Sequence, residues 1–164
     1  MNYFQIESVS SKIREAFEGI ERPDLRAILT LGCCEEHEED FTWYRHHSWE
    51  ELSLEILNEG LDWVDFSVIH PLAYHYFVPA ILTATLESIV SGAQRHNLKG
   101  YDWLSTLIPA EDRAKEFERN YLSMFSSQQI ETVRSHLKFV QSWIIEQRGY
   151  SDDDLERGIK KIWI

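Results

Sequence analysis

Apolar residues recur at helical spacing along most of this 164-residue chain. Near its start, Val9, Ile13, Phe17 and Ile20 fall on one face of a helix, and Pro23 lies just beyond them. Proline is common shortly after the end of a helix because it cannot continue one. The spacing therefore predicts an amphipathic helix that ends before Pro23.

The longest apolar pattern covers residues 72–90. Its apolar positions occupy more than one side of a helix, which is typical of a central helix that is largely buried. Pro71 suits the first position of such a helix, because a proline there loses no hydrogen bond. Pro79 lies inside the pattern and predicts either a kink or the start of a new helix.

Two capping boxes mark further helix starts. In a capping box, a serine side chain accepts a hydrogen bond from the backbone amide of the third helical residue. The side chain of that residue accepts a hydrogen bond from the serine amide in return. Ser48 and Glu51 form the first box, and Ser126 and Gln129 form the second. The second box opens a helix that Gly149 ends. Its apolar stripe is Ile130, Val133, Leu137, Val140 and Ile144.

The C-terminal residues predict one more short helix. The run Asp152–Asp154 places carboxylates where the helix dipole is positive, which stabilises a helix start. Leu155, Ile159 and Ile162 then form an apolar stripe at helical spacing.

The fold class follows from these patterns. Residues 63–69 alternate weakly between apolar and polar, which allows a short strand or an extended connector. The chain has no internal repeat and no linker rich in proline, glycine or serine. We therefore predict an all-α protein, with residues 1–164 forming a single compact bundle of six or seven helices.

Charge is distributed unevenly along the chain. The net charge is −12, and residues 27–94 hold twelve acidic residues against one base, Arg45. With a pI near 5.0, this composition argues against nucleic acid and anionic membranes as partners, because both attract cationic surfaces. The first residues lack the apolar run of a signal peptide, and no segment is long enough to span a bilayer. We therefore expect a cytoplasmic protein.

Carboxylates and aromatic residues alternate within this acidic region. Carboxylates that surround exposed aromatic side chains are typical of a surface that binds a basic protein. The other interpretation is that the aromatic residues are core and the acids merely solvate the surface. We call the following residues the acidic face: Glu35, Glu36, Glu38, Glu39, Asp40, Trp43, Glu50, Glu55, Glu59, Asp62 and Asp65.

Candidate chemistry is sparse. Cys33, Cys34 and His37 are ligands that zinc prefers, but their spacing matches no common zinc motif, so metal binding there stays open. The acids that follow the cysteines raise the thiol pKa and disfavour a nucleophile. His70, Tyr74 and His75 are a candidate small-ligand pocket. We expect no catalytic residue and no cofactor.

Several segments together resemble a known family. These are LGCCEEHEEDF, HHSWEELSLEIL, FSVIHPLAYHYFVPAILTATLE and FSSQQIETVRSHLKFV. They resemble a small bacterial all-α domain family of unknown function, with an acidic Cys/Glu segment, a W-x-x-L helix, a P-x-A-x-x-Y-x-x-P helix and a late S-x-x-Q helix. The resemblance implies a soluble α-helical domain and supplies no catalytic residue.

The functional hypothesis is a binding module that captures and neutralises a basic protein. Its most specific form is an immunity protein against a nuclease-type toxin, because a nuclease presents a cationic groove that carboxylates can occupy. The alternative is a small-ligand or metal-dependent enzyme that uses His70, Tyr74 and His75 together with Cys33 and His37. A third hypothesis is a protein that forms homo-oligomers through apolar helix faces.

Overall fold

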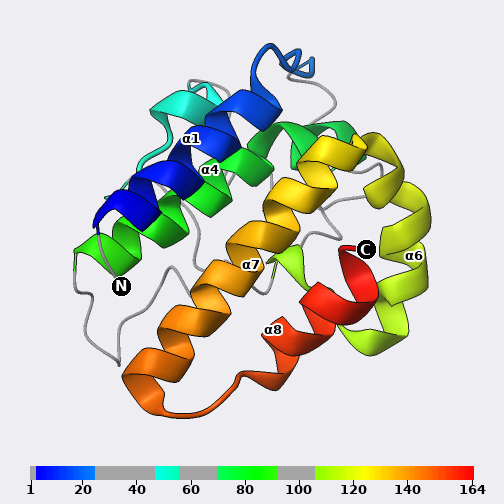
Figure 1. Ribbon diagram of the computed structural model, residues 1–164. Helices are drawn as coiled ribbons and strands as arrows, with labels where there is room; N and C mark the ends of the chain where they lie inside the picture. Colours follow the sequence, from blue (N-terminus) through cyan, green and yellow to red (C-terminus); the bar gives the residue numbers. More distant parts are fainter. Residues whose placement is uncertain (1–2, 25–46, 56–69, 92–105) are drawn as a thin grey trace. The chain divides into compact units, whose positions relative to one another are not determined.

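A computed structural model describes residues 3–24, 47–55, 70–91 and 106–164 (Figure 1). These residues form five α-helices and several single helical turns, and no strand occurs among them. The all-α prediction is therefore confirmed for the described part of the chain, and the count of six or seven helices stays a prediction. The extended connector predicted at 63–69 lies outside the described residues.

The chain divides into two compact units. One unit combines residues 1–18 with residues 107–164, and the other covers residues 19–106. The prediction of one domain over residues 1–164 stays a prediction.

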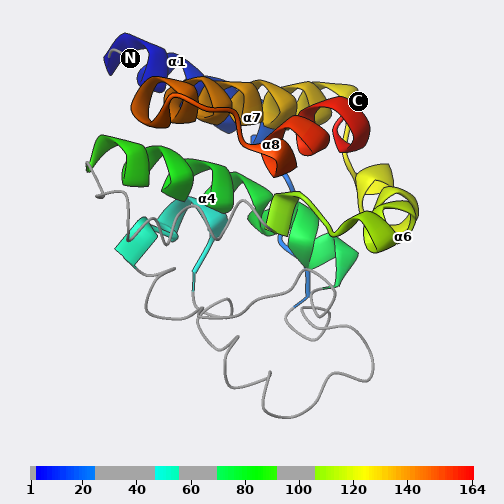
Figure 2. The same cartoon turned by 90° about the horizontal axis from the view of Figure 1, so that it is seen from below.

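The first unit contains most of the described helices. They are α1 (Tyr3–Phe17), α6 (Ala114–Asn120), α7 (Ser127–Arg148) and α8 (Asp153–Arg157). Short turns join or extend them: η5 (Glu111–Arg113), η6 (Leu122–Met124) and the π-helical η7 (Gly158–Ile162). Figures 1 and 2 both show α1 and α7 side by side and antiparallel, with α8 next to α7.

Helix α1 follows the predicted apolar face only in part. Ile13 and Phe17 are buried, Val9 is half-buried, and the ring of Phe17 packs edge-on against Phe125. The helix ends at Phe17, so Ile20 lies beyond it. Gly19, with a φ of 71°, is the residue that turns the chain there, because glycine adopts this left-handed conformation without strain.

Helix α7 matches its sequence pattern closely. The Ser126 amide donates to Oε1 of Gln129 at 2.9 Å, and the Gln129 amide donates to Oγ of Ser126 at 3.2 Å, as a capping box requires. Gly149 ends the helix with a φ of 78°. Four residues of the predicted stripe are buried, namely Val133, Leu137, Val140 and Ile144, and Ile130 at its start is half-buried.

Removing this cap gives a first testable prediction. Ser126→Ala leaves the Gln129 amide without its side-chain acceptor, so we expect the free energy of unfolding to fall by about 1 kcal/mol. Ser127→Ala at the neighbouring exposed position is the matched control, and we expect it to change stability by less than about 0.5 kcal/mol. Urea denaturation followed by circular dichroism measures both. Equal losses in the two variants would show that the cap does not stabilise α7.

The C-terminal residues close the core of this unit around Trp163. Its side chain is fully buried, and its indole Nε1 donates to the carbonyl of Leu107 at 2.8 Å. The ring lies edge-on to Phe117 and Phe125, at centroid distances of 5.8 and 5.2 Å. Arg157 adds a hydrogen bond to the carbonyl of Pro109. The C-terminal turn and the residues near 107–109 are therefore held together by two long-range hydrogen bonds.

The second unit is built on α4 (Pro71–Val90), with the short turn η3 (Trp49–Glu51) in contact with it. Helix α4 continues unbroken through Pro79, so the alternative of a new helix at that residue is wrong. The side chains along most of α4 are buried, which confirms the prediction of a central buried helix. Thr83 and Thr85 bond back to the carbonyls of Pro79 and Ile81, so their hydroxyls are satisfied within the helix.

Candidate functional site

The described part of the acidic face lies on the segment after Ser48. The first capping box predicted a helix there. The chain makes the single turn η3, becomes extended at Leu52, with a ψ of 94°, and is helical again at residues 54–55. The rest of the predicted helix lies outside the described residues. Trp49 and Leu52 are buried, which fixes this segment against its own unit. For Trp49, the interpretation of the aromatic residues as core residues is therefore the correct one.

Hydrogen bonds orient the carboxylates around this segment. The Ser48 amide donates to Oε2 of Glu51 at 2.7 Å. This bond, with a further one from the Ser48 side chain, holds the pKa of Glu51 below its usual value. The Leu54 amide donates to Oε2 of Glu87, which reaches across from α4, at 2.8 Å. These contacts fix the backbone that carries Glu50 and Glu55.

Of the acidic face, Glu50 and Glu55 are described, and both are exposed. Glu51 and Glu87 are exposed as well, and Glu87 is hydrogen-bonded to the same segment. An exposed, anionic surface on a fixed backbone can attract a cationic partner without a large ordering cost. The remaining predicted residues lie outside the described residues: Glu35, Glu36, Glu38, Glu39, Asp40, Trp43, Glu59, Asp62 and Asp65.

At the alternative site, near the start of α4, side chains form hydrogen bonds with backbone groups. His70 caps the helix, since its Nδ1 accepts from the Leu72 amide at 3.3 Å. Tyr74 is buried, and its hydroxyl donates to the carbonyl of Thr106 at 2.9 Å. His75 is half-buried on the same helix. The side chains of His70 and Tyr74 thus have structural roles.

The sequence alone did not decide whether the protein binds a metal ion. Within residues 3–24, 47–55, 70–91 and 106–164, no group of three or more histidine, cysteine, aspartate or glutamate residues could hold a metal ion. Cys33, Cys34 and His37 lie outside those ranges. In the same ranges, no helix is both long enough and apolar enough to cross a membrane.

Sequence reasoning missed His136, the most unusual ionisable group of α7. Its imidazole is completely buried, and neither ring nitrogen has a hydrogen-bond partner among the residues that the structure describes. Burial lowers the pKa of His136 from 6.5 to about 3, because the protonated ring cannot be solvated there. A signal was present in the sequence: His136 lies three residues after Val133 and four before Val140, and so falls on the apolar stripe.

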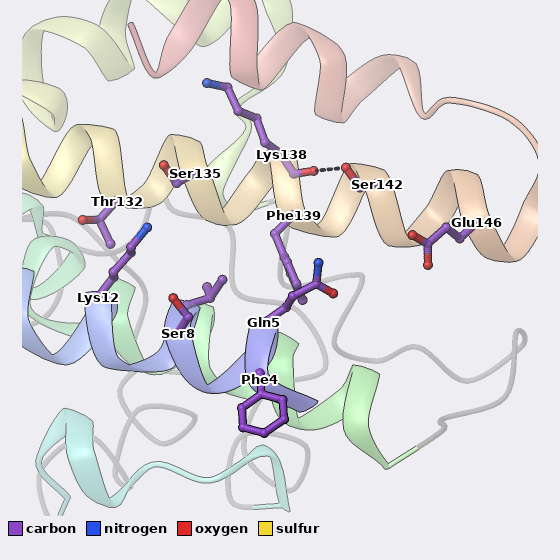
Figure 3. A pocket seen from close by; sticks show the side chains of 11 residues that line it. Phe4, Gln5, Ser8, Lys12, Thr132, Ser135, Lys138, Phe139, Ser142 and Glu146 are labelled. Carbon is purple, nitrogen blue, oxygen red and sulfur yellow. Dashed lines mark hydrogen bonds between the residues drawn. The ribbon is translucent and has the colours of Figure 1, made fainter. Parts of the chain in front are cut away.

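A groove between α1 and α7 was missed as well (Figure 3). Its lining combines two aromatic side chains, the exposed Phe4 and the half-buried Phe139, with lysines and hydroxyl groups from both helices. No sequence signal identifies it, because the two helices that form it are more than a hundred residues apart in the chain.

Comparison with known proteins places the chain in a family. The model of the family described as "Family of unknown function (DUF6714)" matches residues 5–164. No curated protein and no solved structure matches the chain. The match covers nearly the whole sequence and agrees with the resemblance to a small domain family of unknown function. The chain therefore belongs to the DUF6714 family.

Proposed function

We propose that this protein is an acidic binding module that captures and neutralises a basic protein. The observation that carries the proposal is the concentration of charge, since residues 19–106 hold 15 acidic and 5 basic residues. The other unit holds 13 acidic and 11 basic residues, so its net charge is −2 against −10. A field confined to one segment of the chain attracts cationic partners to that segment.

The exposed carboxylates Glu50 and Glu55 support this proposal. Their backbone is anchored through the bonds of Glu51 and Glu87, so they are presented by an ordered surface. Preorganised charges favour rapid association, because long-range attraction guides the partner before short-range contacts form. The most specific version of the proposal is an immunity protein that occupies the cationic groove of a nuclease-type toxin.

The enzyme alternative gains no support from the described residues. His70 and Tyr74 are hydrogen-bonded to backbone groups, and a side chain used in this way is less available to a substrate. The binding module therefore remains the function that we propose.

Charge reversal tests the proposal. The partner is first isolated from native cells by affinity capture at low salt, and its association rate is then measured by stopped flow. We expect a variant with Glu35→Lys, Glu36→Lys, Glu38→Lys and Glu39→Lys to associate at least about tenfold more slowly, because electrostatic steering accelerates association by one to three orders of magnitude.

A matched control reverses four exposed carboxylates of the other unit: Glu7→Lys, Glu15→Lys, Glu18→Lys and Glu118→Lys. It changes the net charge by the same amount, so we expect a much smaller decrease in rate. Equal rates for the two variants would mean that total charge matters and the acidic face does not bind the partner.

A further inference from the structure

The groove between α1 and α7 has a size suited to a small ligand. Its volume is about 540 Å³, and both walls belong to the same compact unit. Small-molecule sites typically enclose about 300–1,000 Å³ and combine apolar walls with a few polar groups. The composition of each wall therefore bears on what would bind.

Apolar side chains form one part of the groove. Phe4 is 79% exposed, and Phe139 and Val9 are half-buried. Figure 3 shows Phe139 extending from α7 toward α1, with Phe4 at the same end of the groove. Apolar side chains that gather in a concave site can pack against the apolar part of a ligand.

Two lysines supply positive charge. Lys12 on α1 and Lys138 on α7 line the groove, and both are exposed. Neither ammonium is in an ion pair with a carboxylate of the described residues, whereas Lys160 and Lys161 are paired with Glu156 and Glu111. Figure 3 shows Lys12 reaching toward Thr132 of the opposite wall, while Lys138 extends from α7 away from α1.

The hydroxyl groups of the groove differ in what they can donate. Thr132 donates to the carbonyl of Gln128, Ser135 to the carboxylate of Glu131, and Ser142 to the carbonyl of Lys138. The hydroxyl protons of these three residues therefore form hydrogen bonds within α7. The donors left facing a ligand include the ammonium of Lys12 and the hydroxyl of Ser8, which is exposed and has no partner among the described residues.

The two ends of the groove differ in their side chains. Figure 3 shows Lys12 and Thr132 at one end, and Phe4, Gln5 and Glu146 at the other. Glu146, the carboxylate of the lining, would repel an anionic group placed beside it. We propose that the groove binds a small amphipathic anion, with its carboxylate or sulfonate at Lys12 and its aromatic or alkyl body along Val9 and Phe139.

Two fluorescent probes that differ in one group test this proposal. Anilinonaphthalene sulfonate has an aromatic body and an anionic head, and N-phenyl-1-naphthylamine has the same body without the sulfonate. With the full chain at neutral pH, we expect the sulfonate probe to saturate a single site. We expect Lys12→Gln to weaken that binding roughly fivefold, as for one exposed charged contact, and to change the neutral probe less than about twofold.

Further variants locate the site. Ser8→Glu introduces a negative charge into the groove and should weaken the anionic probe at least as much as Lys12→Gln. Phe139→Ala should weaken both probes, because it removes part of the apolar wall. Lys115→Gln is the matched control, since Lys115 is exposed, has no ion pair in the described part of the chain and lies outside the groove. Circular dichroism verifies that each variant is folded.

Competition distinguishes the two possible bodies of the ligand. Displacement of the sulfonate probe by decanoate would indicate an alkyl carboxylate, and displacement by 4-phenylbutyrate would indicate an aryl carboxylate. The proposal is overturned if Lys12→Gln and Ser8→Glu both bind the anionic probe as the unchanged protein does, or if neither carboxylate displaces it. This test is independent of the acidic face, so its failure leaves the proposed capture of a basic protein untouched.

Discussion

Replacing Trp163 with alanine is expected to lower the free energy of unfolding by about 4 kcal/mol. Truncating a buried tryptophan typically costs about 3–5 kcal/mol, because apolar contacts are lost and a cavity remains. Trp163 is fully buried between the rings of Phe117 and Phe125, so both of those contacts are lost together. The carbonyl of Leu107 also loses its indole donor. A loss of this size is a large part of the stability of an ordinary domain.

Two further variants separate these contributions. Trp163→Phe keeps an aromatic ring and removes the donor, so we expect it to cost about 1–3 kcal/mol, the effect of leaving a buried acceptor unpaired. Ile164→Ala at the exposed neighbouring position should cost less than about 0.5 kcal/mol. Guanidinium denaturation followed by circular dichroism measures all three. Equal stabilities for Trp163→Ala and Ile164→Ala would show that the indole does not hold the C-terminal turn.

Acidification is expected to destabilise the protein through His136. In the unfolded chain His136 binds a proton near pH 6.5, whereas in the folded chain its pKa is lowered to about 3 by burial. The unfolded state therefore binds the proton first, and stability falls as the pH decreases from about 6.5 toward 3. Between pH 7 and pH 5 the expected loss from this residue is about 2 kcal/mol.

A variant without the titrating ring isolates this effect. His136→Leu fills a similar volume with an apolar side chain and leaves no unpaired ring nitrogen in the core. The difference in unfolding free energy between His136→Leu and the unchanged protein should grow by about 2 kcal/mol from pH 7 to pH 5. Urea denaturation at several pH values measures it. A difference that stays constant with pH would mean that His136 is protonated, or solvated, in the folded state.

Local sequence signals predicted the helices whose stability is decided locally. Helix α7 has a complete capping box, a regular apolar stripe and a terminal glycine, and the structure contains all three. Helix α4 was predicted to be buried because its apolar residues occupy more than one side. The effect of Pro79 was left between two alternatives, because tertiary packing decides whether a helix tolerates an internal proline.

The burial of the C-terminal residues differs in part from the apolar stripe predicted for them. The predicted stripe treated Ile159 as an inward position, but Ile159 is half-buried and Trp163 is fully buried. The cause is the π-helical turn η7, in which the Trp163 amide donates to the carbonyl of Gly158, five residues earlier. Such a turn changes the helical period, so a stripe with a period of 3.6 residues correctly predicts the buried Leu155 and Ile162 but misses Trp163.

The functional surfaces were predictable to different degrees. The acidic face follows from residue counts, and its Glu50 and Glu55 are indeed exposed, but counts do not show that Glu51 and Glu87 anchor the backbone beneath them. Helices distant in the chain form the α1–α7 groove, and their pairing is a long-range contact that periodicity does not encode.

The salt dependence of the association rate tests most directly whether the acidic face captures a basic protein. For the unchanged protein and its isolated partner, we expect the rate to fall steeply as ionic strength rises from about 0.01 M to 0.15 M, because the screening length shortens from about 30 to 8 Å. The variant reversed at Glu35, Glu36, Glu38 and Glu39 should lose most of that dependence. A slope equal to that of the unchanged protein would contradict the proposed role of the acidic face.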